Sequence, residues 1–272
     1  FGWAVKKMKP LIVSRVGGDL RYMLWNSKLL AKLAFFPLLM LTNKQIRTAD
    51  LIISCSPQAT EYVKGLGVNK KRICQSSNFV DTNIFNPKAK KRASKKDNSK
   101  FKVLFVGRDD PIKNFEALRK ACKQLNVHLI AVGIERPHEK NVTYVPWSSQ
   151  ERLAQLYSEA DLCAMPSLYE SFGTVVLESL ACKTPVLVSE GVTAGKLLEK
   201  FVTVTSTRSE DIKSAIQSII ERYEEVKRKT EKGYRKVVRD YSKDVVLKRE
   251  AEAIFEAYNR RQRRKRKEEK ES

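Results

Sequence analysis

The chain has 272 residues, of which 42% are hydrophobic, enough to bury the core of one large or two ordinary domains. This composition excludes a disordered polypeptide. Lys and Arg number 53 against 31 Asp and Glu, and the resulting net charge of +22 favours anionic partners.

The first part of the chain has the pattern of an α/β fold. The apolar runs from Pro10 to Ser14 and from Leu51 to Cys55 predict two buried strands. Ser56 followed by Pro57 is a typical helix start, with a serine cap and a proline in the first turn. Two glycines shortly afterwards predict the end of that helix.

The longest apolar run extends from Leu29 to Leu41, and Lys32 and Pro37 interrupt it. It is too short to span the ~30 Å hydrocarbon layer of a membrane. We expect the run to pack in the interior of the first domain. Contact with a membrane is the functional alternative.

Two basic clusters interrupt these patterns. Lys88 to Lys96 lies between two apolar regions and predicts a solvated linker, and Arg260 to Lys267 lies near the end of the chain. We interpret both as solubilising runs. Nucleic acid is not an expected partner, because no aromatic residues are interleaved to stack on bases. An anionic membrane surface is the functional alternative for these clusters.

From Phe101 onward, strand and helix patterns alternate with short connections, which is typical of a doubly wound α/β domain. Ser148 with Glu151 predicts a capping box at the start of one helix, and Thr207 with Glu210 predicts the start of a later one. Strands are expected at residues 101–106, 127–132, 142–145, 162–165, 185–188 and 202–204, with a helix at about 114–125.

The cysteines are odd in number, widely spaced and mostly embedded in apolar runs, with neither a CxxC pair nor a nearby histidine. This pattern predicts reduced core residues of a cytosolic protein instead of disulfides or a metal site. The five residues are Cys55, Cys74, Cys122, Cys163 and Cys182.

A charged motif from Gly107 to Asn114 follows the strand expected at residues 101–106. Ligands of open α/β sheets bind at the carboxyl ends of the strands, so Arg108 and Lys113 are candidates for contacting one there. The two cations together can do the work of a divalent metal beside an anionic ligand. Taken singly, each would be an ordinary surface charge.

The segment from Pro166 to Glu178 is the most informative motif, because it sets Glu170 and Glu178 around a tight apolar and glycine turn that opens a helix. Ser171 to Thr174 would present backbone N–H groups at that helix N-terminus, which attracts phosphate. A carboxylate accepts hydrogen bonds from both hydroxyls of a cis-diol. The loop at Gly191 is a second candidate at the same sheet edge, and a simple turn is the equal alternative there.

The same segment resembles the donor-binding signature of the family 4 retaining glycosyltransferases. The resemblance implies the GT-B fold, with two Rossmann-like α/β domains, of which the first is incomplete and the second has a complete doubly wound parallel sheet. The implied organisation is a partial N-terminal acceptor-side domain at 1–87, a basic linker at 88–100, a nucleotide-sugar-binding domain at 101–245, and a helix with a basic tail at 246–272.

The resemblance also implies a role for each motif residue. Arg108 and Lys113 would clamp the diphosphate, Glu170 would lie beside the sugar hydroxyls, and the ribose would bind the second glutamate. The implied donor-binding residues are Gly107, Arg108, Lys113, Glu170, Ser171, Phe172, Gly173, Thr174 and Glu178, and the implied catalytic residues are Arg108, Lys113, Glu170 and Asp19.

The first domain departs from the family pattern in one place. Arg15 to Asp19 lies where many relatives have His-Gly-x-Asp, and Val16 occupies the position of the histidine. A valine moves no proton, and the resemblance leaves that task to the leaving phosphate. Asp19 would contact the acceptor or the transferred sugar, or would cap the next helix. The segment Ser76 to Pro87 resembles the interdomain crossover of the family, with Phe79 where Gly is usual.

The resemblance implies transfer of a hexose from a nucleoside diphosphate sugar to the hydroxyl of a sugar or lipid-linked acceptor, with retention of configuration and without a metal or other cofactor. The expected location is cytoplasmic, with peripheral association at the inner face of the membrane. The alternative is a noncatalytic basic binding module, or a truncated relative, that binds a nucleotide or a polyanion without turnover.

Overall fold

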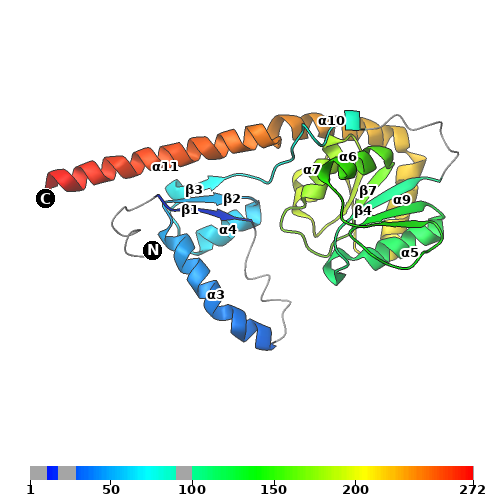
Figure 1. The fold of residues 1–272 in the computed structure, drawn as a ribbon, viewed down its shortest axis with the longest axis horizontal. Helices are drawn as coiled ribbons and strands as arrows, with labels where there is room; N and C mark the ends of the chain where they lie inside the picture. Colours follow the sequence, from blue (N-terminus) through cyan, green and yellow to red (C-terminus); the bar gives the residue numbers. More distant parts are fainter. Residues whose placement is uncertain (1–10, 18–28, 90–99, 272) are drawn as a thin grey trace. The chain divides into compact units, whose positions relative to one another are not determined.

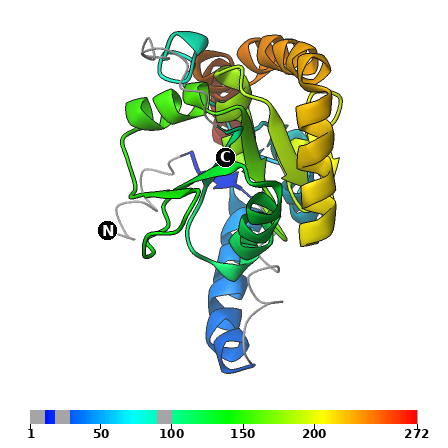
Figure 2. The ribbon, with the colours of Figure 1, turned by 90° about the vertical axis from the view of Figure 1, so that its right-hand side faces the viewer.

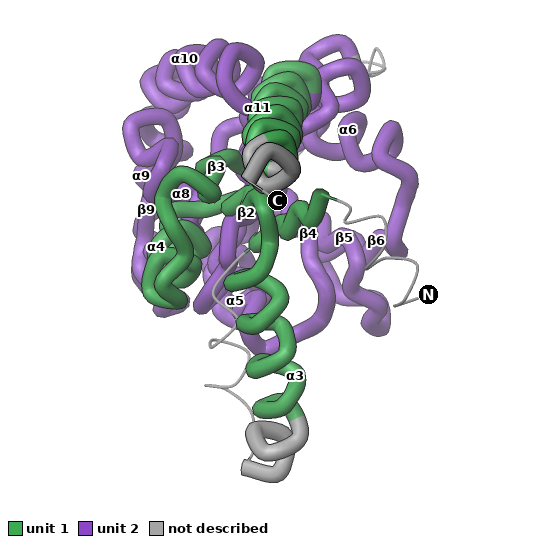
Figure 3. The backbone as a smooth tube through the Cα atoms, turned by 90° about the vertical axis from the view of Figure 1, so that its left-hand side faces the viewer, with its two compact units in different colours: residues 1–78, 244–272 green, residues 79–243 purple. Residues whose placement is uncertain are grey.

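The structure is a computed structural model that describes residues 11–17, 29–89 and 100–271. The chain divides into two compact units, drawn in two colours in Figure 3. Unit 1 comprises Phe1–Asn78 and Asp244–Ser272, and unit 2 comprises Phe79–Lys243. Asp19 and most of the expected linker lie outside the described residues. The domain boundaries that the family resemblance implies are a separate matter and remain predictions.

Unit 1 contains a parallel sheet with the strand order β1-β2-β3. The predicted helix after Ser56 is confirmed, because the Ser56 hydroxyl accepts the N–H of Ala59 at 3.1 Å. The strands are β1 (Val13–Val16), β2 (Leu51–Ser54) and β3 (Ile73–Gln75), and the helices are α3 (Leu29–Thr48), α4 (Pro57–Gly65), the 3-10 turn η1 (Lys70–Arg72) and α11 (Lys243–Glu271). The first strand thus begins three residues later than expected, while Pro10 lies outside the described residues.

The central strand β2 is buried on both faces. Ile52 packs against Ile46 of α3 and against α4, whereas Leu51 and Ile53 point to the other face and pack against Ala257 of α11. In Figure 1, α11 and the pair α3 and α4 accordingly lie on opposite sides of the sheet. Burying both faces of an apolar strand is what stabilises a short parallel sheet.

Helix α3 extends beyond this sheet. Its final turn is buried through Ile46, and its described middle part is exposed to between 43% and 61% at Phe35, Phe36, Leu38, Met40 and Leu41. The expectation that Leu29 to Leu41 packs in the interior is therefore wrong for these residues, because only the end of α3 reaches the narrow sheet. None of the helices in the described ranges combines the length and apolarity needed to cross a membrane.

Unit 2 contains a six-stranded, entirely parallel sheet with the order β6-β5-β4-β7-β8-β9. The strands are β4 (Lys102–Val106), β5 (His128–Val132), β6 (Val142–Val145), β7 (Leu162–Met165), β8 (Val186–Ser189) and β9 (Thr203–Thr205). Each expected strand is confirmed to within one residue at either end. The strand order reverses between β4 and β7, which is where open α/β sheets bind ligands.

Helices cover both faces of the unit 2 sheet, as Figures 1 and 2 show. Val103 and Phe105 face α5 and α9, whereas Leu104 and Val106 face α6, α7 and α10. The helices are η2 (Pro87–Ala89), η3 (Pro111–Lys113), α5 (Phe115–Leu125), α6 (Gln150–Glu159), α7 (Thr174–Ala181), α8 (Thr193–Leu197), α9 (Ser209–Glu221) and α10 (Tyr223–Asp240). The predicted doubly wound α/β architecture is thereby confirmed.

Two predicted helix caps are wrong by one residue. Helix α6 is capped by Ser149, whose hydroxyl accepts the N–H of Arg152 at 3.3 Å, while the hydroxyl of Ser148 donates to a nearby carbonyl. Helix α9 follows Arg208, and Thr207 provides no cap. Adjacent hydroxyl residues have equal capping chemistry, so backbone geometry alone decides which of them serves.

The segment that enters unit 2 is anchored to the segment that leaves it. Val80 forms a parallel bridge with Ser242, and Lys243 Nζ lies 2.9 Å from the carboxylate of Asp81. Phe85 is buried in the core of the unit. The expected crossover segment is thus integrated into unit 2 from Phe79 onward.

All five cysteines are free thiols, which agrees with the predicted reduced state. Burial raises the pKa of Cys122 to about 12 and is the main cause that raises the pKa of Cys182 to about 12. Four of the thiols are buried, and Cys74 is half-buried.

Candidate functional site

The first part of the candidate site is the loop between β4 and α5. The carboxylate of Asp110 caps the turn η3 by accepting the N–H of Ile112 at 3.0 Å. Asn114 follows in the left-handed conformation, and its amide donates to the carbonyl oxygens of Pro166 at 3.2 Å and Thr207 at 2.8 Å. Asparagine is among the few residues that adopt this conformation at low cost. The loop is therefore tied to its neighbours on both sides.

The second part is the loop between β7 and α7. The N–H of Glu170 donates to the carbonyl of Gly191 at 3.0 Å, and the carbonyl of Glu170 accepts the N–H of Thr193 at 3.3 Å. A Cβ atom at Gly191 would lie 2.2 Å from the carbonyl oxygen of Leu168, so glycine alone fits there. Gly173 has a φ of 94°, which also requires glycine. Two glycines thus determine the backbone that presents Glu170.

Lys113 and Glu170 meet between these two loops. Their side chains form an ion pair between Nζ and Oε2, although the residues are 57 positions apart. The side chains are only 19% and 22% exposed, so solvent screens the pair less than it screens a surface ion pair. The N–H of Leu168 donates to the carbonyl of Ile112 at 2.8 Å and joins the two loops beside the pair.

Arg108 lies on the first of these loops, directly after Gly107. Its side chain is 73% exposed, and its guanidinium lies 3.9 Å from the carboxylate of Asp110. A contact of this length at the surface contributes about 0–1 kcal/mol at most. Arg108 can therefore turn toward an anionic ligand at little cost.

Glu178 lies one turn into α7 after Thr174. The hydroxyl of Tyr157 donates to Oε2 of Glu178 at 2.8 Å. Burial raises the pKa of Glu178 above the usual range of a carboxyl group, and the hydrogen bond from Tyr157 offsets part of this effect. Among the residues that the structure describes, no hydrogen bond links Glu178 directly to the pair of Lys113 and Glu170.

The N-terminus of α7 begins beside Glu170. The N–H groups of Thr174 and Val175 have no acceptor within the helix, as at any helix start, whereas the N–H of Val176 donates to the carbonyl of Gly173 at 3.1 Å. Gly173 caps the helix without a side chain, and Phe172 is buried in the core after the half-buried Ser171. These N–H groups and the helix dipole make this end suitable for a phosphate.

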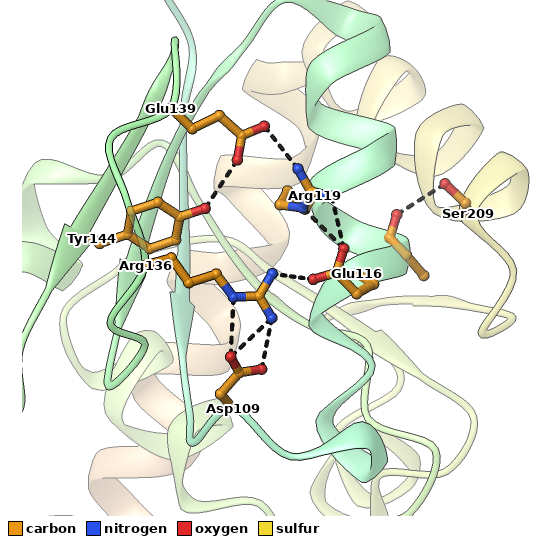
Figure 4. Close-up of polar contacts among 8 residues, drawn as sticks. Asp109, Glu116, Arg119, Arg136, Glu139, Tyr144 and Ser209 are labelled. Carbon is orange, nitrogen blue, oxygen red and sulfur yellow. Dashed lines mark hydrogen bonds and ion pairs between the residues drawn. The ribbon is translucent and has the colours of Figure 1, made fainter.

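A network of charged side chains supports the β4–α5 loop, as Figure 4 shows. Arg136, between β5 and β6, makes a bidentate contact with Asp109, with Nη2 at 2.8 Å from Oδ1 and Nε at 3.0 Å from Oδ2. Arg136 also contacts Glu116. Glu116 pairs with Arg119 at 2.9 Å, and Arg119 reaches Glu139 at 2.8 Å.

The sequence did not predict a role for Arg136. Because Arg136 and Asp109 are 27 residues apart, their pairing has no local pattern. The one available signal was Asp109, the acid that immediately follows Arg108. A carboxylate beside an anion-binding cation would repel the anion unless another cation neutralises it.

An exposed tryptophan lies at the carboxyl end of the same strands. Gly133 has a φ of 83°, and a Cβ atom there would lie 2.7 Å from the ring of Trp147 and 2.8 Å from the carbonyl oxygen of Gly107. Trp147 nevertheless remains 60% exposed. A flat aromatic face is therefore available beside the first loop of the candidate site.

The sequence also offered candidates in the first domain. Asp19 lies outside the described residues, so its role stays a prediction. Val16, at the end of β1, is buried in the core of unit 1, and Arg15 donates to the carbonyl of Ser77 at 3.2 Å. In these described positions, β1 residues serve the packing of unit 1.

Comparison with protein families gives a match over most of unit 2. Residues 87–236, just over half of the chain, match the family described as glycosyl transferases group 1. A D-inositol 3-phosphate glycosyltransferase from Mycobacteroides abscessus is 34% identical over 158 residues, which cover 50% of this chain and 36% of that protein. The aligned part of this chain thus spans well under half of that relative.

Solved structures resemble a larger part of the chain. A sucrose-phosphate synthase from Thermosynechococcus elongatus has a TM-score of 0.76 and 23% identity, covering 96% of this chain and 70% of that one. HepE from Anabaena, solved in complex with UDP-glucose, has a TM-score of 0.74 and 18% identity, covering 94% and 74%. At these identities the likeness concerns the fold.

Proposed function

This chain belongs to the glycosyl transferases group 1 family, and from that membership we propose that it transfers a hexose from a nucleoside diphosphate sugar to an acceptor hydroxyl with retention of configuration. The contact between Lys113 and Glu170 carries the proposal. It sets a cation and a carboxylate side by side at the carboxyl edge of a parallel sheet. The UDP-glucose bound to HepE supports a nucleotide sugar as the donor.

Arg108 and Lys113 are the proposed diphosphate ligands. Negative charge builds on the diphosphate as the sugar–phosphate bond breaks, and fixed cations stabilise that charge more in the transition state than in the ground state. Among the described residues, the guanidinium of Arg108 has one ion pair to give up, its long contact with Asp110. Because two cations can neutralise the diphosphate, the proposed transfer needs no divalent metal.

Donor binding is proposed to separate Lys113 from Glu170, so that each side chain contacts a different part of the donor. The ammonium of Lys113 turns toward a phosphate oxygen, while the carboxylate of Glu170 accepts hydrogen bonds from the sugar hydroxyls. Their contact in the present structure holds both groups in a partly buried position before the donor arrives. This arrangement lowers the cost of ordering them during binding.

The nucleoside is assigned to two other groups. Glu178 uses one oxygen to accept from Tyr157, and its second oxygen is the proposed acceptor for a ribose hydroxyl. The exposed ring of Trp147, beside Gly133, is the proposed surface on which the base stacks. Stacking tolerates every base, so this contact alone gives little discrimination among them.

The acceptor side of the proposal involves the first domain. A sugar or a lipid-linked sugar is the proposed acceptor, with Asp19 as its contact and the leaving phosphate as the group that takes the proton from its hydroxyl. A cytoplasmic protein that associates peripherally with the inner face of the membrane is the proposed setting.

Calorimetry with a panel of uridine, guanosine and adenosine diphosphate sugars tests donor binding, and release of nucleoside diphosphate tests turnover. We expect Lys113→Ala and Glu178→Ala to lose affinity for the donor that binds. Lys120→Ala, on the exposed surface of α5, is the matched control and should bind as the unmodified chain does. Absence of binding to every donor, or equal binding by all variants, would contradict the proposal.

Two further measurements test the chemistry. Proton NMR of the first-formed product should show the anomeric configuration of the donor. Transfer should also persist in the presence of EDTA. An inverted product contradicts retention, and a metal requirement contradicts the role given to Arg108 and Lys113.

The second candidate function is noncatalytic binding of a nucleotide or polyanion. The buried Val16 favours it, because this residue stands where a proton-moving histidine is expected from the family pattern. Tight binding to nucleic acid that weakens with salt, without affinity for any sugar nucleotide, would support this alternative. Donor binding without transfer would indicate a noncatalytic relative.

A further inference from the structure

Tyr157 of α6 carries a polar group where packing alone would need none. Its ring is fully buried in the core of unit 2 and lies edge-on to Phe85, with 6.0 Å between the ring centroids. A phenylalanine would pack in the same space, whereas a buried hydroxyl costs free energy unless it is hydrogen-bonded. The Tyr157 hydroxyl has such a bond, because it donates to Oε2 of Glu178 at 2.8 Å. The hydroxyl is therefore explained by Glu178 and not by the core.

Three further hydrogen bonds fix the position of Tyr157 relative to α7. The hydroxyl of Thr184 donates to the carbonyl oxygen of Tyr157 at 2.6 Å. The N–H of Thr184 donates to the carbonyl oxygen of Ser179 at 2.9 Å, and the hydroxyl of Ser179 donates to the carbonyl oxygen of Thr184 at 3.0 Å. Thr184 and Ser179 are buried, so water does not compete for these bonds. Because Ser179 directly follows Glu178, the network joins the backbones of both hydrogen-bonded residues.

Glu178 lies in surroundings that offer its charge little other support. The residue is half-buried, and burial raises the pKa of its carboxyl group. The hydrogen bond from Tyr157 acts in the opposite direction and favours the ionised carboxylate. The titratable groups nearby on β7 and at the end of α7 are the thiols of Cys163 and Cys182, and burial is the main cause that raises the pKa of both. These thiols are therefore neutral near pH 7 and provide no opposite charge.

We propose that Tyr157 is a positioning residue for the donor, whose hydroxyl turns the Glu178 carboxylate so that its second oxygen accepts from a ribose hydroxyl. This inference rests on the proposed function and adds a residue that does not itself touch the donor. The last torsion of a glutamate has a broad preference, so holding one oxygen fixes the plane of the carboxylate. A carboxylate that is fixed before the ligand arrives is ordered at lower cost during binding.

A role in packing alone predicts a different result from a positioning role. Tyr157→Phe keeps the ring and its contact with Phe85, and removes the hydrogen bond to Glu178. If the hydroxyl only contributes to stability, its loss affects all ligands of the site equally. If the hydroxyl positions Glu178, the loss concerns only ligands that have ribose hydroxyls. A nucleotide without these hydroxyls therefore separates the two roles.

Calorimetry of the full chain with UDP, GDP and ADP, each beside its 2′,3′-dideoxy counterpart, makes this comparison. For the nucleotide that binds best, we expect Tyr157→Phe to lose roughly tenfold in affinity. The affinity for its dideoxy counterpart should stay unchanged. Tyr223→Phe is the matched control, because it removes a phenol that donates to the carbonyl oxygen of Asp161 at 3.1 Å. This control should bind both forms as the unmodified chain does, and circular dichroism confirms that each variant is folded.

A second variant pair tests whether Tyr157 acts through Glu178. Adding Tyr157→Phe to Glu178→Ala should cause no further loss of affinity, because the hydroxyl then has no carboxylate to orient. Unchanged affinity of Tyr157→Phe, an equal loss for the ribose and dideoxy forms, or a further loss on top of Glu178→Ala would overturn the inference and leave donor binding intact. Absence of binding of all three nucleotides to the unmodified chain would contradict the proposed function, and the inference with it.

Discussion

Around the β4–α5 loop, each acid that lies beside the proposed anion site has a partner that engages its carboxylate. Asp109 and Asp110 directly follow Arg108, and two free carboxylates there would repel a diphosphate. The structure engages both, since Asp110 caps η3 and Asp109 is held by Arg136. The positive potential of Arg108 is therefore left for a ligand.

Replacing Arg136 tests this balance. In Arg136→Ala the carboxylate of Asp109 loses its bidentate partner, and we expect the affinity for UDP-glucose, measured by calorimetry, to fall by roughly tenfold. Adding Asp109→Asn in the same chain should restore most of the affinity, because the repulsive charge is gone. A double variant that binds as weakly as Arg136→Ala would show that loop structure, not charge, is responsible.

The half-buried Glu178 predicts a dependence of stability on pH. Burial raises its pKa above the ordinary value of 4.5, so the folded chain holds this proton more tightly than the unfolded chain does. The associated stability is present in acid and is lost as the pH rises through the raised pKa. We expect Glu178→Gln to resist urea better than the unmodified chain at neutral pH and equally well in acid. Lower resistance of Glu178→Gln at neutral pH contradicts this assignment.

Among the elements, the four inner strands of unit 2 were predictable because both of their faces are buried, which makes each of β4, β5, β7 and β8 a short continuous apolar run. Parallel topology then placed the residues after β4 and β7 at one edge, so the meeting of Lys113 with Glu170 follows from the order of strands. The contact of Arg136 with Asp109 depends on the shape of two loops, and the direction of α3 depends on the width of a sheet. Neither has a periodic signal.

Packing between loops predicts the effect of one substitution. In Gly191→Ala the new Cβ would meet the backbone of Leu168, which cannot move aside as a side chain would. We expect the free energy of unfolding, measured in urea, to fall by about 3 kcal/mol. Gly65→Ala has nothing within 4 Å of the new Cβ and should not be destabilised. Equal stability of both variants contradicts the close approach of the two loops.

At the scale of the whole molecule, the chain passes from unit 1 to unit 2 after Asn78 and returns to unit 1 after Lys243. The first point lies in the segment Ser76 to Pro87, which resembles the crossover of the family, whereas no turn residue marks the second. No glycine or proline occurs after Gly233, so the helical pattern continues without interruption through the second exchange. The composition of the chain predicts that α11 is a helix, but the unit that it packs against is decided by long-range contacts of Glu250 and Ala257.

Both hydrophobic cores of unit 2 consist only of residues between 79 and 243. We therefore expect a fragment of these residues to fold alone, with a cooperative urea transition by circular dichroism. Because Lys113, Glu170 and Glu178 all lie within it, the fragment should also retain affinity for UDP-glucose. A gradual, noncooperative transition would show that the unit needs the rest of the chain.

Unit 1, in contrast, needs segments from both ends of the chain. The side of β2 formed by Leu51 and Ile53 is covered by α11, which comes more than 180 residues later. During translation these strands leave the ribosome long before Ala257 is made. The nascent polypeptide therefore carries an uncovered apolar sheet surface until the α11 segment around Ala257 is made. A premature stop after unit 2 would leave a folded Rossmann half attached to a half that invites aggregation and chaperone capture.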